Sequence, residues 1–121
     1  MTPLLAVVDD DISVRESLES LIRSAGMAVS VFGSAEEFLD SAQPNKLDCL
    51  ILDVRMPGMS GIELLETMRR RGDLHPVIVI SGRTDPWTRK RAHAAGALAI
   101  LDKPYQVKEV LELLRAASDR D

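Results

Sequence analysis

The stretch Leu4-Leu5-Ala6-Val7-Val8-Asp9-Asp10-Asp11 is an apolar run that stops at three carboxylates. Further short apolar runs follow along the chain, at residues 28–32, 49–52, 77–80 and 98–101. Several of these runs are continuous rather than alternating, which is typical of parallel strands that are covered on both faces. We therefore predict five short parallel strands.

The segments between these runs predict helices. Apolar residues recur with helical spacing on one face of the segments 14–25, 62–68 and 107–114. Ser34 with Glu37 predicts a capping box at the start of another helix. Asp85 before Pro86 predicts the start of a helix that continues to Ala95. Because strands and helices alternate, we expect an α/β, flavodoxin-like (βα)5 fold, with a doubly wound parallel sheet in the order 2-1-3-4-5.

The composition is that of one globular domain. The chain has 121 residues, of which 45% are hydrophobic and 28% charged, so we expect a single domain over residues 1–121. A net charge of -4 argues against direct binding of nucleic acid. No apolar stretch approaches the roughly 20 residues of a membrane span, so we expect a cytoplasmic protein. Cys49, the single cysteine, lies in an apolar run and is predicted to be buried and unreactive.

Acidic residues follow two of the predicted strands. In the expected strand order, Asp9 and Asp10 lie beside Asp53. This is the crevice at the carboxyl ends of the strands, where the strand order reverses and where ligands bind in such sheets. Carboxylates so close together repel, so either one takes a proton or a cation neutralises them. A hard cation such as Mg²⁺ fits best, because it binds through carboxylates, waters and phosphate oxygens. The alternative is that these carboxylates are simply solvated turn residues.

Ser81 and Lys103 follow two further strands at the same edge. The ammonium group of Lys103 could hold a phosphoryl oxygen or pair with Asp53, whereas an ordinary surface lysine would do neither. The hydroxyl of Ser81 could donate to a phosphoryl oxygen, or it could cap the turn before Gly82. Together these side chains suit phosphoryl chemistry.

These residues, in their order along the chain, resemble the receiver domains of bacterial two-component response regulators. The resemblance extends from about Leu4 to Ala117. It rests on four motifs, namely Asp9-Asp10, the run Leu52-Asp53-Val54-Arg55-Met56-Pro57-Gly58-Met59-Ser60-Gly61, Ser81-Gly82 and Lys103-Pro104. The run 52–61 resembles in particular the receivers that are coupled to helix-turn-helix output domains.

The resemblance implies that Asp53 is the phosphoacceptor and the nucleophile of the reaction. It implies that Mg²⁺, or Mn²⁺ in its place, binds directly to Asp10, Asp53 and the backbone carbonyl of Arg55. Asp9 would act on this ion mostly through water. Asp11 matches a variable position of the family and lies outside the core site.

The resemblance also implies roles at the two other strand ends. Lys103 would offset charge on the transferring phosphoryl group, and Pro104 would shape the loop that aims Lys103. The family often has a cis peptide bond at this proline. Ser81, with Gly82 as its small follower, would move towards the phosphoryl group and so bias a two-state switch, in which the helix 85–95 and its flanking loops are expected to move.

At three positions the chain departs from the usual family pattern. Ile100 stands where receivers have an aromatic residue, so the usual aromatic readout of the switch is in doubt. Arg55 and Arg83 stand at positions whose side chains lie over the phosphoryl group in the family. They would either shield the group from water and give a durable phosphoaspartate, or remain solvated at the mouth of the site.

The implied partner is a sensor histidine kinase or a phosphotransfer protein. A homodimer could form through the helix 85–95, the strand 98–101 and the helix 107–114, with opposite charges pairing across a two-fold axis, or this charged face could simply be solvated. The charges are those of Arg89, Lys90, Arg91 and His93 on the first helix and Glu109 and Glu112 on the second. Trp87 would be an anchor for a partner if it is exposed, and His93 is expected at the surface. We do not expect an enzyme, since a receiver catalyses only its own phosphoryl transfer and slow autodephosphorylation.

Three other functions fit the sequence less well. A phosphohydrolase with an aspartate nucleophile would need a second aspartate at position 55, where the chain has arginine. A degenerate receiver that only binds partners would need a damaged site, yet the site residues are present. A nucleotide- or flavin-binding module would show glycine-rich phosphate motifs, and none is found. Whether the chain is a complete regulator or a receiver from a longer protein stays open.

Overall fold

The computed structural model describes residues 3–41, 47–82 and 85–118. Within these ranges five strands alternate with five helices. The strands are β1 (Leu4–Val8), β2 (Ala28–Phe32), β3 (Cys49–Asp53), β4 (Val77–Ser81) and β5 (Ala99–Asp102). The helices are α1 (Ile12–Ser24), α2 (Ala35–Asp40), α3 (Gly61–Arg70), α4 (Pro86–Ala94) and α5 (Val107–Ser118).

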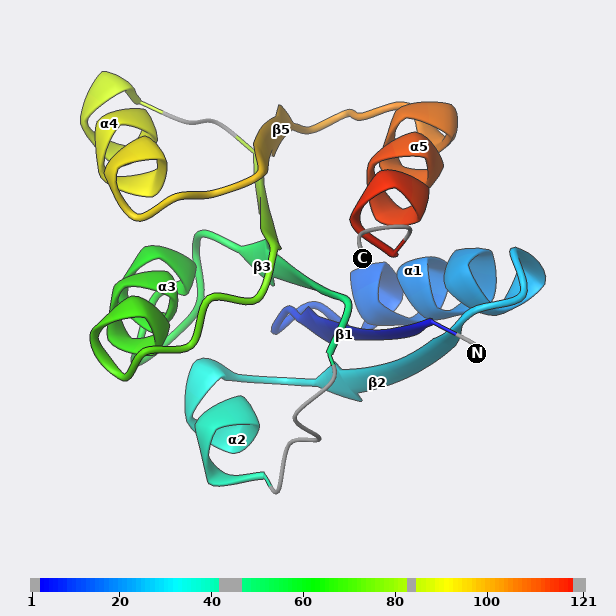
Figure 1. Ribbon diagram of the computed structural model, residues 1–121, viewed down its shortest axis with the longest axis horizontal. Helices are drawn as coiled ribbons and strands as arrows, with labels where there is room; N and C mark the ends of the chain where they lie inside the picture. The colour runs from blue at the N-terminus through cyan, green and yellow to red at the C-terminus, as the bar shows by residue number, and fades with distance from the viewer. Residues whose placement is uncertain (1–2, 42–46, 83–84, 119–121) are drawn as a thin grey trace.

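The strands form one parallel sheet in the order β2-β1-β3-β4-β5, so the predicted flavodoxin-like topology is confirmed. Helices α1 and α5 lie on one face of the sheet, and α2, α3 and α4 lie on the other (Figure 1). Strands β1 and β3 are neighbours at the centre, with Val8 opposite Leu52. The residues that follow β1 therefore come out beside the end of β3.

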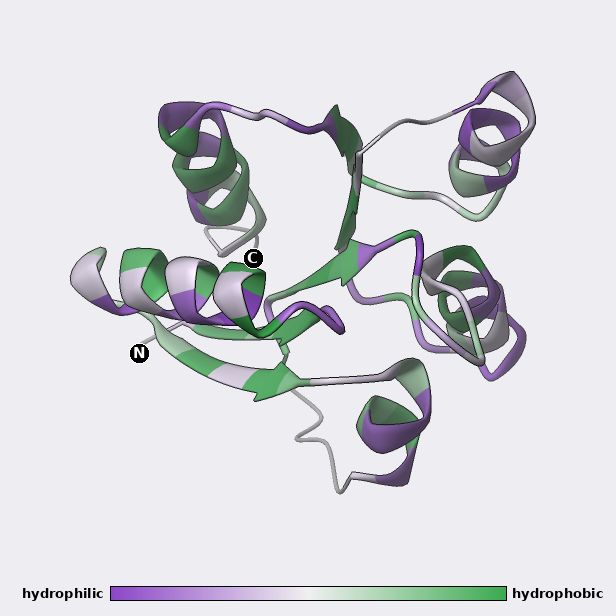
Figure 2. Ribbon diagram, turned by 180° about the vertical axis from the view of Figure 1, so that it is seen from behind, coloured by the Kyte–Doolittle hydropathy of each residue, from purple (hydrophilic) through white to green (hydrophobic). Residues whose placement is uncertain are grey.

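The core consists of two apolar clusters, one on each side of the sheet. Every residue of β3 and β4 is buried, which explains why these strands read as continuous apolar runs. The apolar faces of the helices turn towards the sheet (Figure 2). Burial raises the pKa of the Cys49 thiol to about 12, in agreement with the predicted buried cysteine. Among the described residues, no helix has the length and apolar character required to cross a membrane.

The helix starts follow the predicted caps with one difference. Asp85 accepts a hydrogen bond from the backbone N–H of Thr88 at 2.7 Å, and Pro86 opens α4 as predicted. Ser34 accepts from the N–H of Glu37 at 3.0 Å, but the Glu37 carboxylate accepts from Gly33 instead of closing the predicted capping box. A complete capping box is found at the start of α3, formed by Ser60 and Glu63.

Candidate functional site

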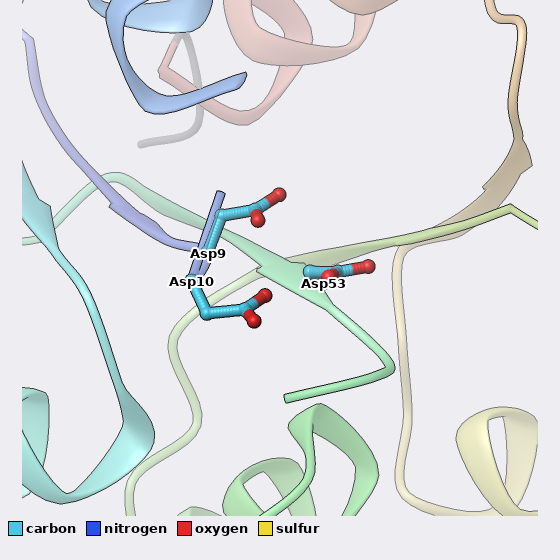
Figure 3. A group of neighbouring side chains, drawn as sticks. All are labelled: Asp9, Asp10 and Asp53. Carbon is cyan, nitrogen blue, oxygen red and sulfur yellow. The ribbon is translucent and has the colours of Figure 1, made fainter. Parts of the chain in front are cut away.

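Three carboxylates converge at the carboxyl edge of the sheet, as the strand order predicts. Asp9 and Asp10 follow β1, and Asp53 ends β3; their side chains point in the same direction (Figure 3). One oxygen from each of the three lies within 4.8 Å of the others. Asp9 and Asp53 are only 2% and 8% exposed, whereas Asp10 is exposed to solvent. The site is thus a partly buried acidic cluster that is open on one side.

Burial and mutual repulsion disfavour the charged form of this cluster. The pKa of Asp53 is raised to about 6, first by burial and then by the charge of Asp9. Lys103 and a hydrogen bond from the backbone N–H of Arg55 act in the opposite direction. The pKa of Asp9 is also raised by burial, against a hydrogen bond from the N–H of Asp11 at 2.9 Å.

The donor set fits a hard divalent cation. All three side chains offer carboxylate oxygens, which Mg²⁺ and Mn²⁺ prefer. Their spacing allows one ion to be reached from each side chain, directly or through a water. A cation at this position would offset the repulsion that raises the pKa of Asp53.

Lys103 brings the positive charge that the sequence places opposite Asp53. Its Nζ lies 3.9 Å from Oδ1 of Asp53, and its side chain is 32% exposed. The backbone N–H of Lys103 donates to the carbonyl of Ser81 at 2.7 Å, which ties the end of β5 to the end of β4. The peptide bond between Lys103 and Pro104 is cis. Of the roles that the sequence allows for Lys103, this distance fits an ion pair with Asp53.

The remaining predicted positions lie around this centre. Ser81 is fully buried at the end of β4, and Gly82 is exposed. Among the described residues other than its chain neighbours, no atom lies within 4 Å of where a Cβ on Gly82 would stand. Ile100 is half-buried and packs against the apolar cluster beneath α2, α3 and α4. Arg83 lies outside the described residues.

The exposed side chain of Arg55 lines a cleft of about 530 Å³ between the β3–α3 loop and α4. The other residues that line it are Val54, Met56, Pro57, Ser60, Ile62, Thr88 and Arg91. Arg55 therefore lies between the phosphoacceptor candidate and the helix that is expected to move.

The sequence patterns assign no role to three further residues around the site. Asp11 is the N-cap of α1, where its side chain accepts from the N–H of Ser13 at 2.9 Å; an aspartate just before a helical segment could have indicated this. Arg15 donates to the backbone carbonyl of Asp9 at 2.7 Å. Tyr105 is half-buried, and its pKa is raised by burial and by the charge of Asp9. Local sequence patterns gave no signal for these last two contacts.

Comparisons with known proteins agree with this geometry. A family model described as the response regulator receiver domain matches residues 5–115. The chain is 43% identical over 118 residues to nodulation protein W of Bradyrhizobium diazoefficiens. It is 41% identical over 114 residues to the response regulator protein TodT of Pseudomonas putida. These matches cover 98% and 94% of this chain but 52% and 50% of the two relatives, so the chain spans about half the length of the curated relatives it matches.

Solved structures show the same likeness. The response regulator StyR superposes with a TM-score of 0.88 at 41% identity, over 98% of this chain and 60% of that protein. The chemotaxis protein CheY4 of Vibrio cholerae superposes with a TM-score of 0.87 at 28% identity, over 97% and 99% of the two chains. With the family match, the sheet order and the acidic edge in agreement, the chain belongs to the response regulator receiver domain family.

Proposed function

We propose that the chain is a phosphorylation switch in which Asp53 accepts a phosphoryl group with the help of Mg²⁺ or Mn²⁺. The observation that carries the proposal is the convergence of Asp9, Asp10 and Asp53 within 4.8 Å, with Lys103 beside Asp53 at 3.9 Å. This arrangement has an oxygen nucleophile, the carboxylates for a hard cation and a fixed ammonium group. These are the parts that a phosphoryl transfer dominated by positioning and electrostatics requires.

In the proposed reaction a carboxylate oxygen of Asp53 attacks the phosphorus of a phosphohistidine. The new O–P bond forms as the P–N bond breaks, and the histidine nitrogen leaves with the bonding electrons and takes up a proton. A pKa of about 6 keeps Asp53 mostly ionised at neutral pH and more basic than an ordinary aspartate. Asp10, Asp53 and the Arg55 carbonyl are the proposed direct metal ligands, with Asp9 acting mostly through water.

The remaining groups act on the oxygens of the phosphoryl group. Lys103 would move from its pairing with Asp53 to an oxygen of the new phosphoryl group, a charge-assisted contact. The hydroxyl of Ser81 would donate to another oxygen. Bound Mg²⁺ would supply further positive charge to offset the charge that develops in the transfer. Arg55 and Arg83 are proposed to shield the product from water.

The switch would act through the face formed by α4, β5 and α5. Inward movement of Ser81 draws the Ser81–Gly82 loop with it, and Ile100 would repack in the space that this movement leaves. Trp87 on α4 is 67% exposed and is a proposed anchor for a homodimer or an output domain. His93 is exposed as predicted. Arg89 and Arg91 form ion pairs within the chain, with Asp102 and Glu66, so they are less suited to pairing across a dimer axis.

The proposed partners follow from membership of the family. The phosphodonor would be a sensor histidine kinase or a phosphotransfer protein in the cytoplasm, and the domain would catalyse its own phosphorylation and slow dephosphorylation rather than turn over a substrate. Two relatives are named as a transcriptional regulatory protein, FixJ, and a DNA-binding transcriptional regulator, NtrC. We propose that any contact with DNA is made by an attached helix-turn-helix output domain and not by this domain.

Intact mass spectrometry after incubation with acetyl phosphate tests the proposal. We expect the gain of one phosphoryl group that requires Mg²⁺ and is lost in Asp53→Asn. Asp11→Asn is the matched control, because Asp11 belongs to the same acidic run but caps α1, and this variant should still be phosphorylated. Without an adduct from acetyl phosphate or from phosphorylated kinases, the domain would instead be one that only binds partners.

A further inference from the structure

Two charged side chains, one from α1 and one from α2, form hydrogen bonds with the backbone of the loops that carry the proposed metal ligands. One loop follows β1 and holds Asp9 and Asp10, and the other joins β3 to α3 and holds Arg55. Arg15 on α1 reaches the first loop, and Glu36 on α2 reaches the second. Neither side chain was singled out by the sequence patterns.

Arg15 holds the peptide that links the two acidic residues. Its Nη1 donates to the backbone carbonyl of Asp9 at 2.7 Å, and this carbonyl belongs to the peptide bond between Asp9 and Asp10. The same nitrogen lies 3.3 Å from the position where a Cβ would stand on Gly33, so the absence of a side chain there leaves room for the guanidinium group. The orientation of the Asp10 backbone therefore depends on a side chain from α1.

Glu36 holds the outer part of the β3–α3 loop. Its Oε2 accepts a hydrogen bond from the backbone N–H of Met59 at 2.9 Å, and this bond is the main cause that lowers the pKa of Glu36. Gly58 has a positive φ of 74°, and a Cβ there would come within 2.6 Å of the same oxygen. The base of the loop is closed separately, because Gly61 donates to the carbonyl of Val54 at 3.0 Å.

We propose that Arg15 and Glu36 are positioning residues of the metal site, which set its affinity for a divalent cation by fixing the backbone that presents Asp10 and the Arg55 carbonyl. The inference rests on the function proposed above. Removing a contact that orients a metal ligand typically lowers metal affinity by about 10–100-fold. Both contacts here are made to backbone groups, so they fix the position of a metal-ligating group and do not change its charge.

Arg15→Met separates positioning from electrostatics, because the two effects have opposite signs. Removing a cation beside an acidic cluster should tighten Mg²⁺ binding if charge dominates, whereas losing the hydrogen bond to Asp9 should weaken it if positioning dominates. Methionine keeps most of the apolar stem, so the packing of α1 is retained. Arg23→Met is the matched control, since Arg23 lies on the same helix and pairs only with Glu19 among the contacts described for it.

Glu36 offers a second, independent comparison. Glutamine keeps an oxygen that can accept from Met59, whereas alanine removes it. If Glu36 acts by positioning the loop, Glu36→Gln should retain the wild-type affinity for Mg²⁺, and Glu36→Ala should bind Mg²⁺ more weakly. Asp40→Ala is the matched control, because Asp40 is another exposed acid of α2 and no contact with the metal-binding loops is described for it.

The experiment is calorimetric titration with Mg²⁺ at fixed ionic strength and without phosphodonor, with thermal unfolding in EDTA to verify that each variant is folded. We expect Arg15→Met and Glu36→Ala to raise the Mg²⁺ dissociation constant about tenfold, and both controls and Glu36→Gln to stay close to the wild type. Unchanged or tighter binding by folded Arg15→Met, or equal losses in Glu36→Gln and Glu36→Ala, would overturn the inference. A wild type that binds no Mg²⁺ would instead overturn the proposed function.

Discussion

The guanidinium group of Arg91 on α4 donates two hydrogen bonds to the carboxylate of Glu66 on α3, at 2.6 and 3.1 Å. Arg69 on α3 also donates to the carbonyl of Ala95, just after α4, at 2.8 Å. Ala92 is the buried residue of α4, so this helix places little apolar surface against the rest of the domain. Polar contacts with α3 therefore contribute much of what holds α4 in place, which suits a helix that is expected to move.

Glu66→Gln should loosen α4. A neutral amide cannot reproduce the charge-assisted double hydrogen bond to Arg91, and a partly exposed ion pair of this kind contributes about 0.5–1 kcal/mol. Amide hydrogen exchange in α4 should accelerate by about two- to fivefold, as these energies imply. Glu19→Gln, which breaks the exposed pair with Arg23 on α1, is the control and should leave exchange in α4 unchanged. Equal exchange in wild type and Glu66→Gln would show that the pair does not hold the helix.

Gly61→Ala should damage the site through its backbone. A Cβ on Gly61 would stand 2.1 Å from the carbonyl oxygen of Asp53, and a backbone atom at that distance cannot give way without moving Asp53. We expect a loss of about 1–3 kcal/mol in the free energy of unfolding, with slower phosphorylation of Asp53 by acetyl phosphate. Gly82→Ala is the control for stability, because no atom of the part of the chain that the structure describes, its chain neighbours aside, lies within 4 Å of its Cβ position. A Gly61→Ala variant as stable as the wild type would contradict the close approach.

The strand order and the acidic edge could be predicted because they depend on local patterns. Continuous apolar runs identified the buried strands, and the topology rule for doubly wound sheets then placed Asp9 and Asp10 beside Asp53. The contacts of Arg15 and Glu36 could not be predicted in this way. Each joins a charged side chain to a backbone group of another segment, and charged side chains on helices follow no periodicity that indicates such a partner.

The predicted capping box at Ser34 shows a smaller limit of the same kind. The pattern of Ser34 and Glu37 fits, and its first hydrogen bond is present at 3.0 Å. The glutamate side chain, however, accepts from Gly33, one residue before the cap. A pattern fixes which residues can meet, but the rotamer of an exposed glutamate is decided by the particular turn that precedes the helix.

Lys103→Gln should separate metal binding from phosphorylation. The ammonium group lowers the pKa of Asp53 and competes electrostatically with a cation at the acidic cluster, so its loss should leave Mg²⁺ binding intact or tighter. Phosphorylation should slow by at least about tenfold, because the substitution removes a preorganised positive charge that would stabilise the transferring phosphoryl group. Calorimetric titration with Mg²⁺ and intact mass measured over time give the two quantities. Lys108→Gln, an exposed lysine on α5, is the control for the change in charge. Weaker Mg²⁺ binding in Lys103→Gln alone would assign the lysine to the structure of the site instead.

Asp53→Asn should stabilise the metal-free domain at neutral pH. The pKa of Asp53 is about 6 in the folded chain and 3.8 ordinarily, so between these values the folded state binds more protons than the unfolded state. The stability of the wild type in EDTA should therefore fall as the pH rises through this range. Above it, the cost of keeping Asp53 charged is on the order of 3 kcal/mol, and asparagine does not incur it.

Urea unfolding in EDTA at a series of pH values measures this difference directly. The stability of Asp53→Asn should exceed that of the wild type above pH 6, and the gap should close as the pH falls below 3.8, where the wild-type carboxyl is protonated in both states. Mg²⁺ should narrow the gap at neutral pH, because a cation at the cluster offsets the same repulsion from Asp9. Asp40→Asn, an exposed aspartate at the end of α2, serves as the control and should show no such gap. A difference in stability that stays constant across the pH range would mean that Asp53 titrates like an ordinary aspartate and that burial does not destabilise its charged form.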